Sequence, residues 1–204
     1  MDRWSDVDVA FAVADGADAD TIIHEWTALL DRELGVTHHW DLRRGALLYR
    51  VFLFQSGLEL DVGLIPQFEF GARGPSFRLV FGEGVEQPPS EAPVNDLIGL
   101  GWHHSLHARA AIDRGHSWKA EFYVGALRDH ALALACIRLG EPFEYASGID
   151  KLPRGLTNPY EEAIGRSLEP GELSRALAVA TRLFLGEVNH VDAELHDRLR
   201  PLLP

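Results

Sequence analysis

Three aspartates have the residue type and spacing needed to bind a metal ion: Asp6, Asp8 and Asp61. Residues two apart on a strand point to the same face, about 6.6 Å apart along the chain, so Asp6 and Asp8 share a face if a strand begins here. Asp61 is flanked by apolar residues, where a carboxylate is costly without a partner or a metal. Carboxylates of this kind suit Mg²⁺, which takes further ligands from water and from substrate phosphates. The three residues therefore predict a site for Mg²⁺, with two ions as the expected number.

Alternating side chains predict that two strands position these aspartates. One run has Asp8 and Ala10 on its polar face, and the other has Asp61 and Gly63 on its polar face. The small neighbours, Ala10 and Gly63, predict open space for a ligand above the sheet. An isolated Asp-x-Asp pair is equally typical of a solvated turn, but a pair at the start of a strand favours a site. The two runs are residues 7–13 and 58–65.

The first half of the chain has the pattern of an α+β unit. Helical spacing predicts a helix over residues 21–34, with Asp20 as its cap and Gly35 at its end. Residues 46–54 are expected to pair with residues 58–65 as an antiparallel hairpin. The fold class is therefore α+β, with a small mixed or antiparallel sheet and helices. Arg43 and Arg44 could approach phosphates, but a solvated turn is the favoured interpretation.

The second half has helical periodicity throughout. We expect helices over residues 94–113, 117–139 and 171–199, the second capped by Ser117 and ended by Gly140. The proline-rich segment from Glu86 to Pro93 is interpreted as a linker. The predicted domains are residues 1–90, the α+β domain, and residues 94–204, an all-α helical bundle.

Composition narrows the class of protein further. With 46% hydrophobic and 25% charged residues, the chain is typical of a soluble globular protein. Cys136 is the only cysteine, and we see no export signal and no apolar stretch long enough for a bilayer, so a cytoplasmic protein with no membrane partner is expected. The net charge of -12 disfavours nucleic acid as a partner and favours divalent metals and cationic small molecules.

The motif Ser5-Asp6-Val7-Asp8-Val9 resembles the paired-carboxylate motif of the DNA polymerase beta-type nucleotidyltransferases. Leu60-Asp61-Val62 is similar to the third acidic position of that superfamily. The resemblance is closest to the small bacterial members that transfer a nucleotide to aminoglycoside or lincosamide antibiotics. It implies a Mg²⁺-dependent enzyme that uses a nucleoside triphosphate such as ATP or GTP as co-substrate, with Asp6, Asp8 and Asp61 as metal ligands.

One part of the superfamily pattern is not matched. Members carry a Gly-Ser turn at a helix start before the first aspartate, where backbone N–H groups and the hydroxyl hold the triphosphate. Here the nearest candidate for nucleotide binding is Ser5, which directly abuts Asp6 and cannot supply that turn. We expect either that the domain is N-terminally truncated because the chain starts too far downstream, which we favour, or that this is a shortened relative with weakened or lost catalysis.

Candidate residues in the helical half lie on one face of the second predicted helix. The residues are Glu121, Gly125 and Arg128, spaced four and three apart. Because Gly125 has no side chain, it leaves space between the two charged side chains. By resemblance, Glu121 would accept the proton of the substrate hydroxyl, and Lys119 or Arg128 would contact phosphate oxygens. The alternative is a salt bridge between Glu121 and Arg128.

Other side chains in the helical half are given structural roles. His103 and His107 have a spacing that zinc sites use, but no further ligand motif accompanies them, so no metal is assigned there. The aromatic residues of this region could stack on a substrate ring, but we predict that they are core. These aromatic residues are Trp102, Trp118, Phe122 and Tyr123.

Together these features predict transfer of a nucleoside monophosphate from a nucleoside triphosphate to a hydroxyl of a small, cationic, antibiotic-like molecule. The alternative is an antitoxin-like or regulatory protein that nucleotidylates a partner protein or only binds it. A degenerate nucleotide-binding module is a third interpretation.

Overall fold

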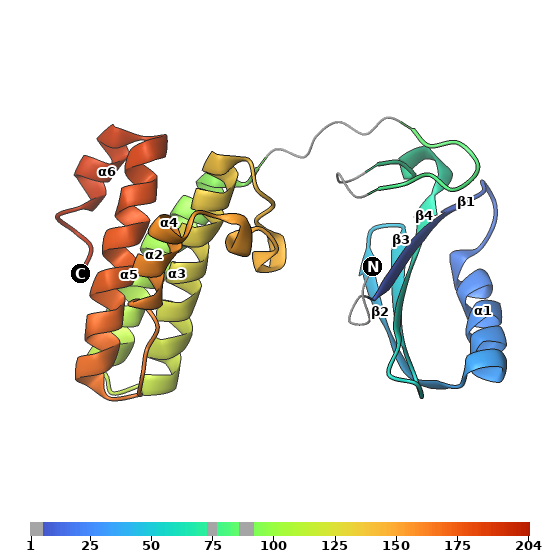
Figure 1. The fold of residues 1–204 in the computed structure, drawn as a ribbon, viewed down its shortest axis with the longest axis horizontal. Helices are drawn as coiled ribbons and strands as arrows, with labels where there is room; N and C mark the ends of the chain where they lie inside the picture. The colour runs from blue at the N-terminus through green and yellow to red at the C-terminus, as the bar shows by residue number, and fades with distance from the viewer. Residues whose placement is uncertain (1–5, 73–76, 86–91) are drawn as a thin grey trace. The chain divides into compact units, whose positions relative to one another are not determined.

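The computed structural model describes residues 6–72, 77–85 and 92–204 (Figure 1). The chain divides into two compact units, Met1–Ser90 and Glu91–Pro204. Most of the predicted linker, residues 86–91, lies outside the described residues. The predicted fold class is confirmed, because the first unit is a four-stranded mixed sheet with a helix and the second unit is helical.

The first unit is built from β1 (Val7–Val13), α1 (Ala19–Leu34), β2 (Val36–Arg44), β3 (Leu47–Phe54) and β4 (Glu59–Pro66). Its strands lie in the order β1-β4-β3-β2. β1 is parallel to β4, and the other two pairs are antiparallel. The predicted strand over 7–13 and the predicted hairpin are confirmed. A short 3₁₀ turn, Gln67–Glu69, follows β4.

One face of this sheet is covered by α1, as Figure 1 shows. Its core contains Ile23 of α1, Leu48 and Phe52 of β3, and Val62 and Leu64 of β4, all almost completely buried. Burying a side chain of this size stabilises the fold by about 1.5–3 kcal/mol. The alternation of large apolar residues along the strands therefore directs the opposite side chains to the other face of the sheet.

The start of α1 differs from the prediction. The capping side chain is Asp18, whose carboxylate accepts from the backbone N–H of Asp20 and of Thr21. Asp20 is inside the first turn and pairs with Arg43 instead. Gly35 does end the helix, with a positive φ of 70° and its N–H bonded to the Asp31 carbonyl.

Strand β2 was not predicted, and the interpretation of Arg43 and Arg44 as a turn is wrong. β2 is an edge strand with one neighbour, so most of its residues are exposed and its alternation of apolar and polar side chains is weak. Asp41 of β2 accepts two hydrogen bonds from Arg50 of β3, at 2.6 and 2.8 Å. Arg50 also donates to Thr27 of α1 at 2.7 Å, so one guanidinium joins the two strands to the helix.

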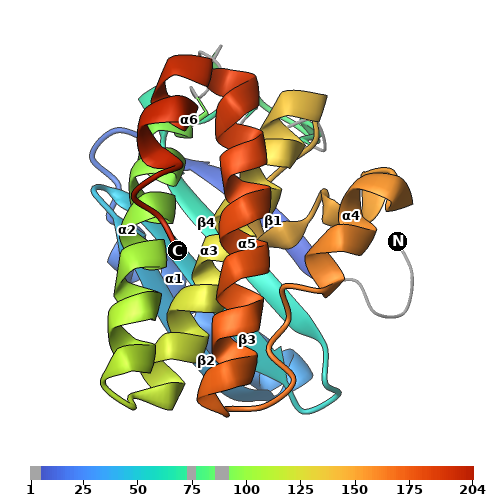
Figure 2. The ribbon, with the colours of Figure 1, turned by 90° about the vertical axis from the view of Figure 1, so that its left-hand side faces the viewer.

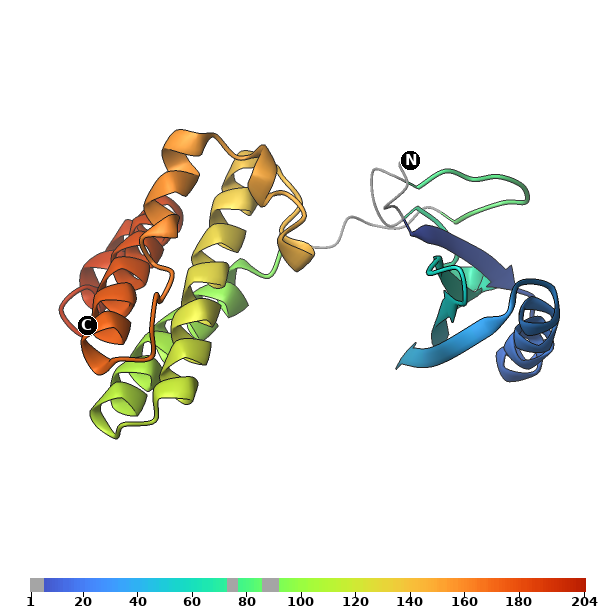
Figure 3. The same cartoon turned by 60° about the horizontal axis from the view of Figure 1, so that its bottom comes forward.

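The second unit packs α2 (Val94–Asp113), α3 (Ser117–Leu139) and α5 (Pro170–Val191) side by side (Figures 2 and 3). The shorter helices are α4 (Arg154–Glu161) and α6 (Ala193–Leu199), and α4 was not predicted. Short 3₁₀ turns lie at Glu144–Ala146 and Ile149–Lys151. No helix in the described residues is long and apolar enough to cross a membrane.

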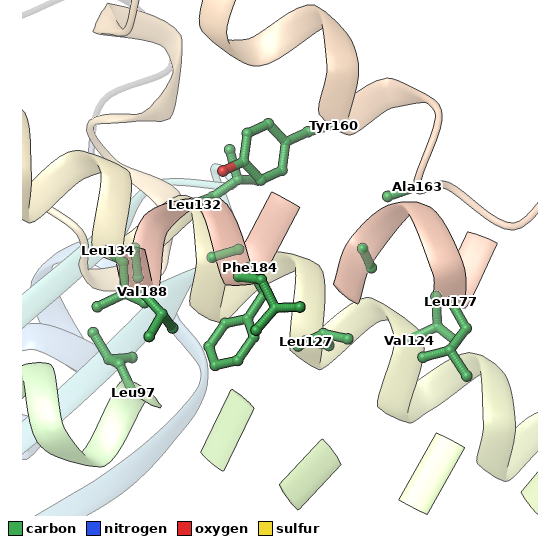
Figure 4. Close-up of a cluster of buried hydrophobic side chains, with 14 of the residues drawn as sticks. Leu97, Val124, Leu127, Leu132, Leu134, Tyr160, Ala163, Leu177, Phe184 and Val188 are labelled. Carbon is green, nitrogen blue, oxygen red and sulfur yellow. The ribbon is translucent and has the colours of Figure 1, made fainter. Parts of the chain in front are cut away.

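The core of the second unit lies between these helices (Figure 4). Phe184 of α5 is fully buried there, and it packs directly over the backbone of Gly101 in α2. A Cβ atom at Gly101 would lie 2.2 Å from the Phe184 ring, so only glycine allows this approach. Nearby, the buried hydroxyls of Ser105 and Thr181 are hydrogen-bonded to each other at 3.0 Å.

Two helix ends in this unit correct the predictions. The expected helix over 171–199 is two helices, because Asp192 leaves the helical conformation (φ -151°, ψ 98°) and its side chain accepts from the Leu195 N–H to cap α6. At the start of α3 the N-cap is His116, so Ser117 is the first helical residue and not its cap. Gly140 ends α3 in the left-handed conformation, as predicted.

Candidate functional site

Asp8 and Asp61 lie side by side on the sheet face opposite α1. They are direct partners across the parallel β1–β4 pair, where neighbouring strands are about 4.8 Å apart. Their neighbours Val9 and Val62 belong to the core under α1, which fixes both carboxylates on the other face. The predicted facing of these two aspartates is thus confirmed.

Asp6 lies just before β1 and is exposed. Ser5, the candidate for nucleotide binding, lies outside the described residues. The structure places Asp8 and Asp61 side by side, with Asp6 near enough for its negative charge to raise the pKa of both, and the metal role of Asp6 stays a prediction.

Asp61 is electrostatically strained. Its pKa is raised to about 6, first by burial and then by the negative charges of Asp8, Glu59 and Asp6. Its Oδ1 is buried and has no hydrogen-bond partner among the described residues. The pKa of Asp8 is raised as well, first by desolvation and then by Asp6. A cation between these carboxylates would satisfy the orphaned oxygen and offset the repulsion.

The donor set available for a metal is a carboxylate pair. Within residues 6–72, 77–85 and 92–204, no group of three or more His, Cys, Asp or Glu side chains is gathered so as to hold an ion. Mg²⁺ is commonly held by one or two carboxylates, with waters and substrate phosphates completing its shell. Asp8 and Asp61 fit that mode, whereas a preformed cage of protein ligands is absent from the described part of the chain.

A cleft of about 800 Å³ lies over the same face of the first unit. Asp8 and Asp61 form part of its wall, together with Tyr49 and Phe70. Residues 77–83 form another part of the wall. A cleft of this size is sufficient for a small organic ligand, and the carboxylate pair would lie within reach of it.

The predicted open space above Gly63 is occupied. A Cβ atom at Gly63 would lie 2.8 Å from Cε1 of Tyr49, its cross-strand partner on β3. The absent side chain thus admits the tyrosine ring and does not leave a void. The prediction of open space was wrong at this position, because the sequence of β4 alone does not show that the large Tyr49 side chain of β3 lies over Gly63.

Residues 77–83 were missed by the sequence analysis. Phe77, Leu79, Val80 and Phe81 are all exposed in this segment, which has no regular secondary structure. Phe77, Leu79 and Phe81 recur at every second position, a pattern that would have suggested a strand. Their position in the wall of the cleft depends on the tertiary fold.

The candidates in the second unit share one face of α3. A Cβ atom at Gly125 would lie 3.8 Å from Nη2 of Arg128 and 4.0 Å from Oε1 of Glu121, so the predicted shared face is confirmed. Arg128 donates to Asp129 at 2.8 Å, and the alternative ion pair between Arg128 and Glu121 is not formed in the described structure. Lys119 places its Nζ 5.9 Å from the centre of the Tyr123 ring. The catalytic and phosphate-binding roles of these residues stay predictions.

The aromatic residues of this region are not all core. Trp118 is 76% exposed and Phe122 is 63% exposed, and Trp102 is also exposed. Only Tyr123 packs against the core. The prediction was wrong for the other three because their helical positions are on the outward side of α2 and α3.

Four histidines gather between α2 and α3. His103 and His107 have ring centres 4.2 Å apart, and Nδ1 of His104 lies 3.1 Å from Nε2 of His130. Burial is the main cause that lowers the pKa values of His104 and His130. This cluster is not a metal site of three ligands within the described residues.

No protein-family model matches this sequence, and no curated protein sequence matches it. Among solved structures, the chain is similar to an aminoglycoside 6-adenyltransferase from Bacillus subtilis, with a TM-score of 0.46 and 14% sequence identity. The match covers 93% of this chain and 81% of that chain.

Proposed function

We propose that the protein transfers a nucleoside monophosphate from a nucleoside triphosphate to a hydroxyl of a small molecule, with release of pyrophosphate. The observation that carries the proposal is the in-register pair of Asp8 and Asp61, with the orphaned Asp61 Oδ1, in the wall of a cleft. A structural aspartate would be hydrogen-bonded or paired with a cation. Asp61 has the environment of a ligand whose partner arrives with the substrate.

In this proposal Asp8 and Asp61, with Asp6, hold Mg²⁺. An ion bound there would polarise the phosphoryl oxygens as a Lewis acid and would offset the charge of the triphosphate. The chain's own groups orient the reactants, since the cleft over the sheet holds the nucleotide beside the carboxylate pair. Glu121 keeps its proposed role as acceptor of the hydroxyl proton, and Lys119 and Arg128 keep their proposed roles toward phosphate.

The acceptor is proposed to be small and cationic. The net charge of -12 remains negative after two Mg²⁺ ions bind, so the field of the protein concentrates cations. Aminoglycoside-like molecules combine positive charge with several hydroxyl groups. A tRNA, by contrast, would be repelled by this field.

Pyrophosphate release tests the proposal directly. The full chain is incubated with MgATP or MgGTP and a panel of hydroxylated acceptors, cationic and neutral, alongside Asp8→Asn and Asp61→Asn. We expect acceptor-dependent release by the wild type and none by either variant. Asp15→Asn is the matched control, because Asp15 lies in an exposed turn of the same unit. Absence of release with every nucleotide and acceptor would contradict the proposal.

A second candidate function is binding of a partner protein, by a regulatory or antitoxin-like protein. The exposed Trp118 and Phe122, one helical turn apart on α3, favour it, because such residues are enriched at protein interfaces. Co-expression with proteins encoded nearby, followed by size-exclusion chromatography, tests this candidate. A stable complex that is lost on Trp118→Ala would support it, and elution of the chain alone would contradict it.

A further inference from the structure

Residues 77–83 expose several large apolar side chains to solvent. Val80 is 83% exposed and Phe81 is 73% exposed, while Phe77 lies edge-on against Phe70 with ring centres 6.0 Å apart. These side chains line the cleft that also contains Asp8 and Asp61. Exposed apolar side chains gathered at a cleft are typical of a ligand-binding wall.

Another part of the wall also carries an aromatic ring, that of Tyr49 on β3. Tyr49 fits over Gly63 at 2.8 Å from the position of a Cβ atom, so its ring is held in place by the adjacent strand. The cleft therefore combines aromatic side chains from β3 and from residues 77–83 with a carboxylate pair from β1 and β4. A ligand with a flat apolar part could contact the aromatic side chains, while its phosphate part could bind Mg²⁺ held by the carboxylate pair.

The side chains of residues 77–83 distinguish between the two reactants of the proposed reaction. Arg78 is the one cation among the described residues that line the cleft, and it lies between Phe77 and Leu79 in the aromatic wall. Glu83 in the same segment balances the charge of Arg78, so a cationic, polyhydroxylated acceptor is disfavoured there by the apolar side chains, which offer it few hydrogen-bonding groups. A nucleobase offers a π-face to the aromatic rings, and its attached phosphates are attracted to a guanidinium.

We propose that residues 77–83 and Tyr49 form the nucleobase subsite of the cleft, with Phe81 as the stacking ring and Arg78 near the phosphates. This inference rests on the proposed function. Because every nucleobase has a π-face, stacking gives affinity with little discrimination between bases. ATP and GTP are therefore expected to bind with similar affinity.

Equilibrium binding with two probes tests the subsite. The probes are the Mg²⁺ complex of α,β-methylene-ATP, which carries a base, and that of inorganic tripolyphosphate, which does not. The variants of the full chain are Phe81→Ala, Phe81→Leu and Phe81→Trp. Phe68→Ala is the matched control, because Phe68 is 68% exposed in the same unit but does not line the cleft.

The wild type should bind α,β-methylene-ATP more tightly than tripolyphosphate. Phe81→Ala should weaken binding of the nucleotide by about 5- to 150-fold, the range for loss of one stacking contact. Its binding of tripolyphosphate should stay unchanged, Phe81→Leu should be intermediate, and Phe81→Trp should retain nucleotide binding. Phe68→Ala should behave as wild type.

The binding results distinguish failure of the nucleobase subsite from failure of the proposed function. If both probes bind equally well, or if Phe81→Ala binds the nucleotide like wild type, the base lies elsewhere and the subsite is refuted while the proposed function stands. If neither probe binds to the wild type, the proposed function fails and the subsite fails with it. Phe81 is largely exposed, so circular dichroism should show a folded Phe81→Ala protein.

Discussion

Replacing Asp61 by Asn should stabilise the metal-free protein at neutral pH. The pKa of Asp61 is raised from 3.8 to about 6, first by burial, and its Oδ1 lacks a partner among the described residues. A folded-state pKa above the unfolded value means that the protonated form favours folding. That contribution is fully present below about pH 4 and is lost as the pH rises through about 6.

The magnitude follows from the pKa change. A rise from 3.8 to about 6 corresponds to about 3 kcal/mol, and solvent screening of this partly exposed group reduces the effect to about 1–2 kcal/mol. At pH 7.5 in EDTA, Asp61→Asn should therefore unfold at a higher urea concentration than wild type. Hydrogen–deuterium exchange of peptides from β1 and β4 reports the first unit separately.

Two conditions should abolish the advantage of Asp61→Asn. At pH 3.5 the carboxyl is mostly protonated in both the folded and the unfolded wild-type chain, so the two proteins should have nearly equal stability. Mg²⁺ should stabilise the wild type by mass action and leave Asp61→Asn unchanged. Asp15→Asn is the control and should show neither effect. A lower stability of Asp61→Asn than of wild type in EDTA at pH 7.5 would contradict this prediction, since Asp61 would then have a structural role.

Three further predictions concern the second unit. Gly101→Ala should destabilise it by about 1–3 kcal/mol in thermal unfolding, because the methyl group would lie 2.2 Å from a core phenylalanine ring, whereas Gly99→Ala, with open space, should not. The pKa values of His104 and His130 are lowered, so the stability they contribute is present above about pH 6.5 and is lost as the pH falls. His130→Asn should therefore flatten the dependence of the urea midpoint between pH 7.5 and 5, and an unchanged slope would contradict this. Glu121→Gln should lower turnover by about 10²- to 10⁴-fold with nucleotide affinity intact, and near-normal turnover would remove the base assignment.

Strands with one buried face were predictable from the sequence, because burial imposes alternation. In β1 and β4 the large apolar residues alternate in the sequence and place Asp8 and Asp61 on a common face, whereas β3 is a nearly continuous apolar run and β4 is buried on both faces from Val62 to Ile65. β2 could not be predicted in the same way, since it is polar and exposed along most of its length, unlike β1 at the other edge of the sheet. The break at Asp192 was also hidden, because a capping aspartate resembles an exposed residue inside a helix.

The cleft itself required the three-dimensional structure. Gly63 suggested open space, but the neighbouring strand places the Tyr49 ring there. Residues 77–83 have apolar alternation and yet form an irregular wall, and no local pattern indicates which surface they approach. Residue types revealed the carboxylates, whereas packing between distant segments determined what surrounds them.

The parallel pairing of β1 with β4 has a consequence for the order of folding. The β3–β4 hairpin is closed by a short turn, but β1 is separated from β4 in sequence by α1, β2 and β3. Contacts at long sequence separation carry a larger loop-closure entropy, so we expect β1 to dock late onto an existing hairpin. The repulsion between Asp8 and Asp61 then arises after the rate-limiting barrier and should act mainly on the unfolding rate. Mg²⁺ would accordingly slow opening of the sheet edge more than it speeds folding, which makes the lifetime of the folded first unit a measure of occupancy of the carboxylate pair.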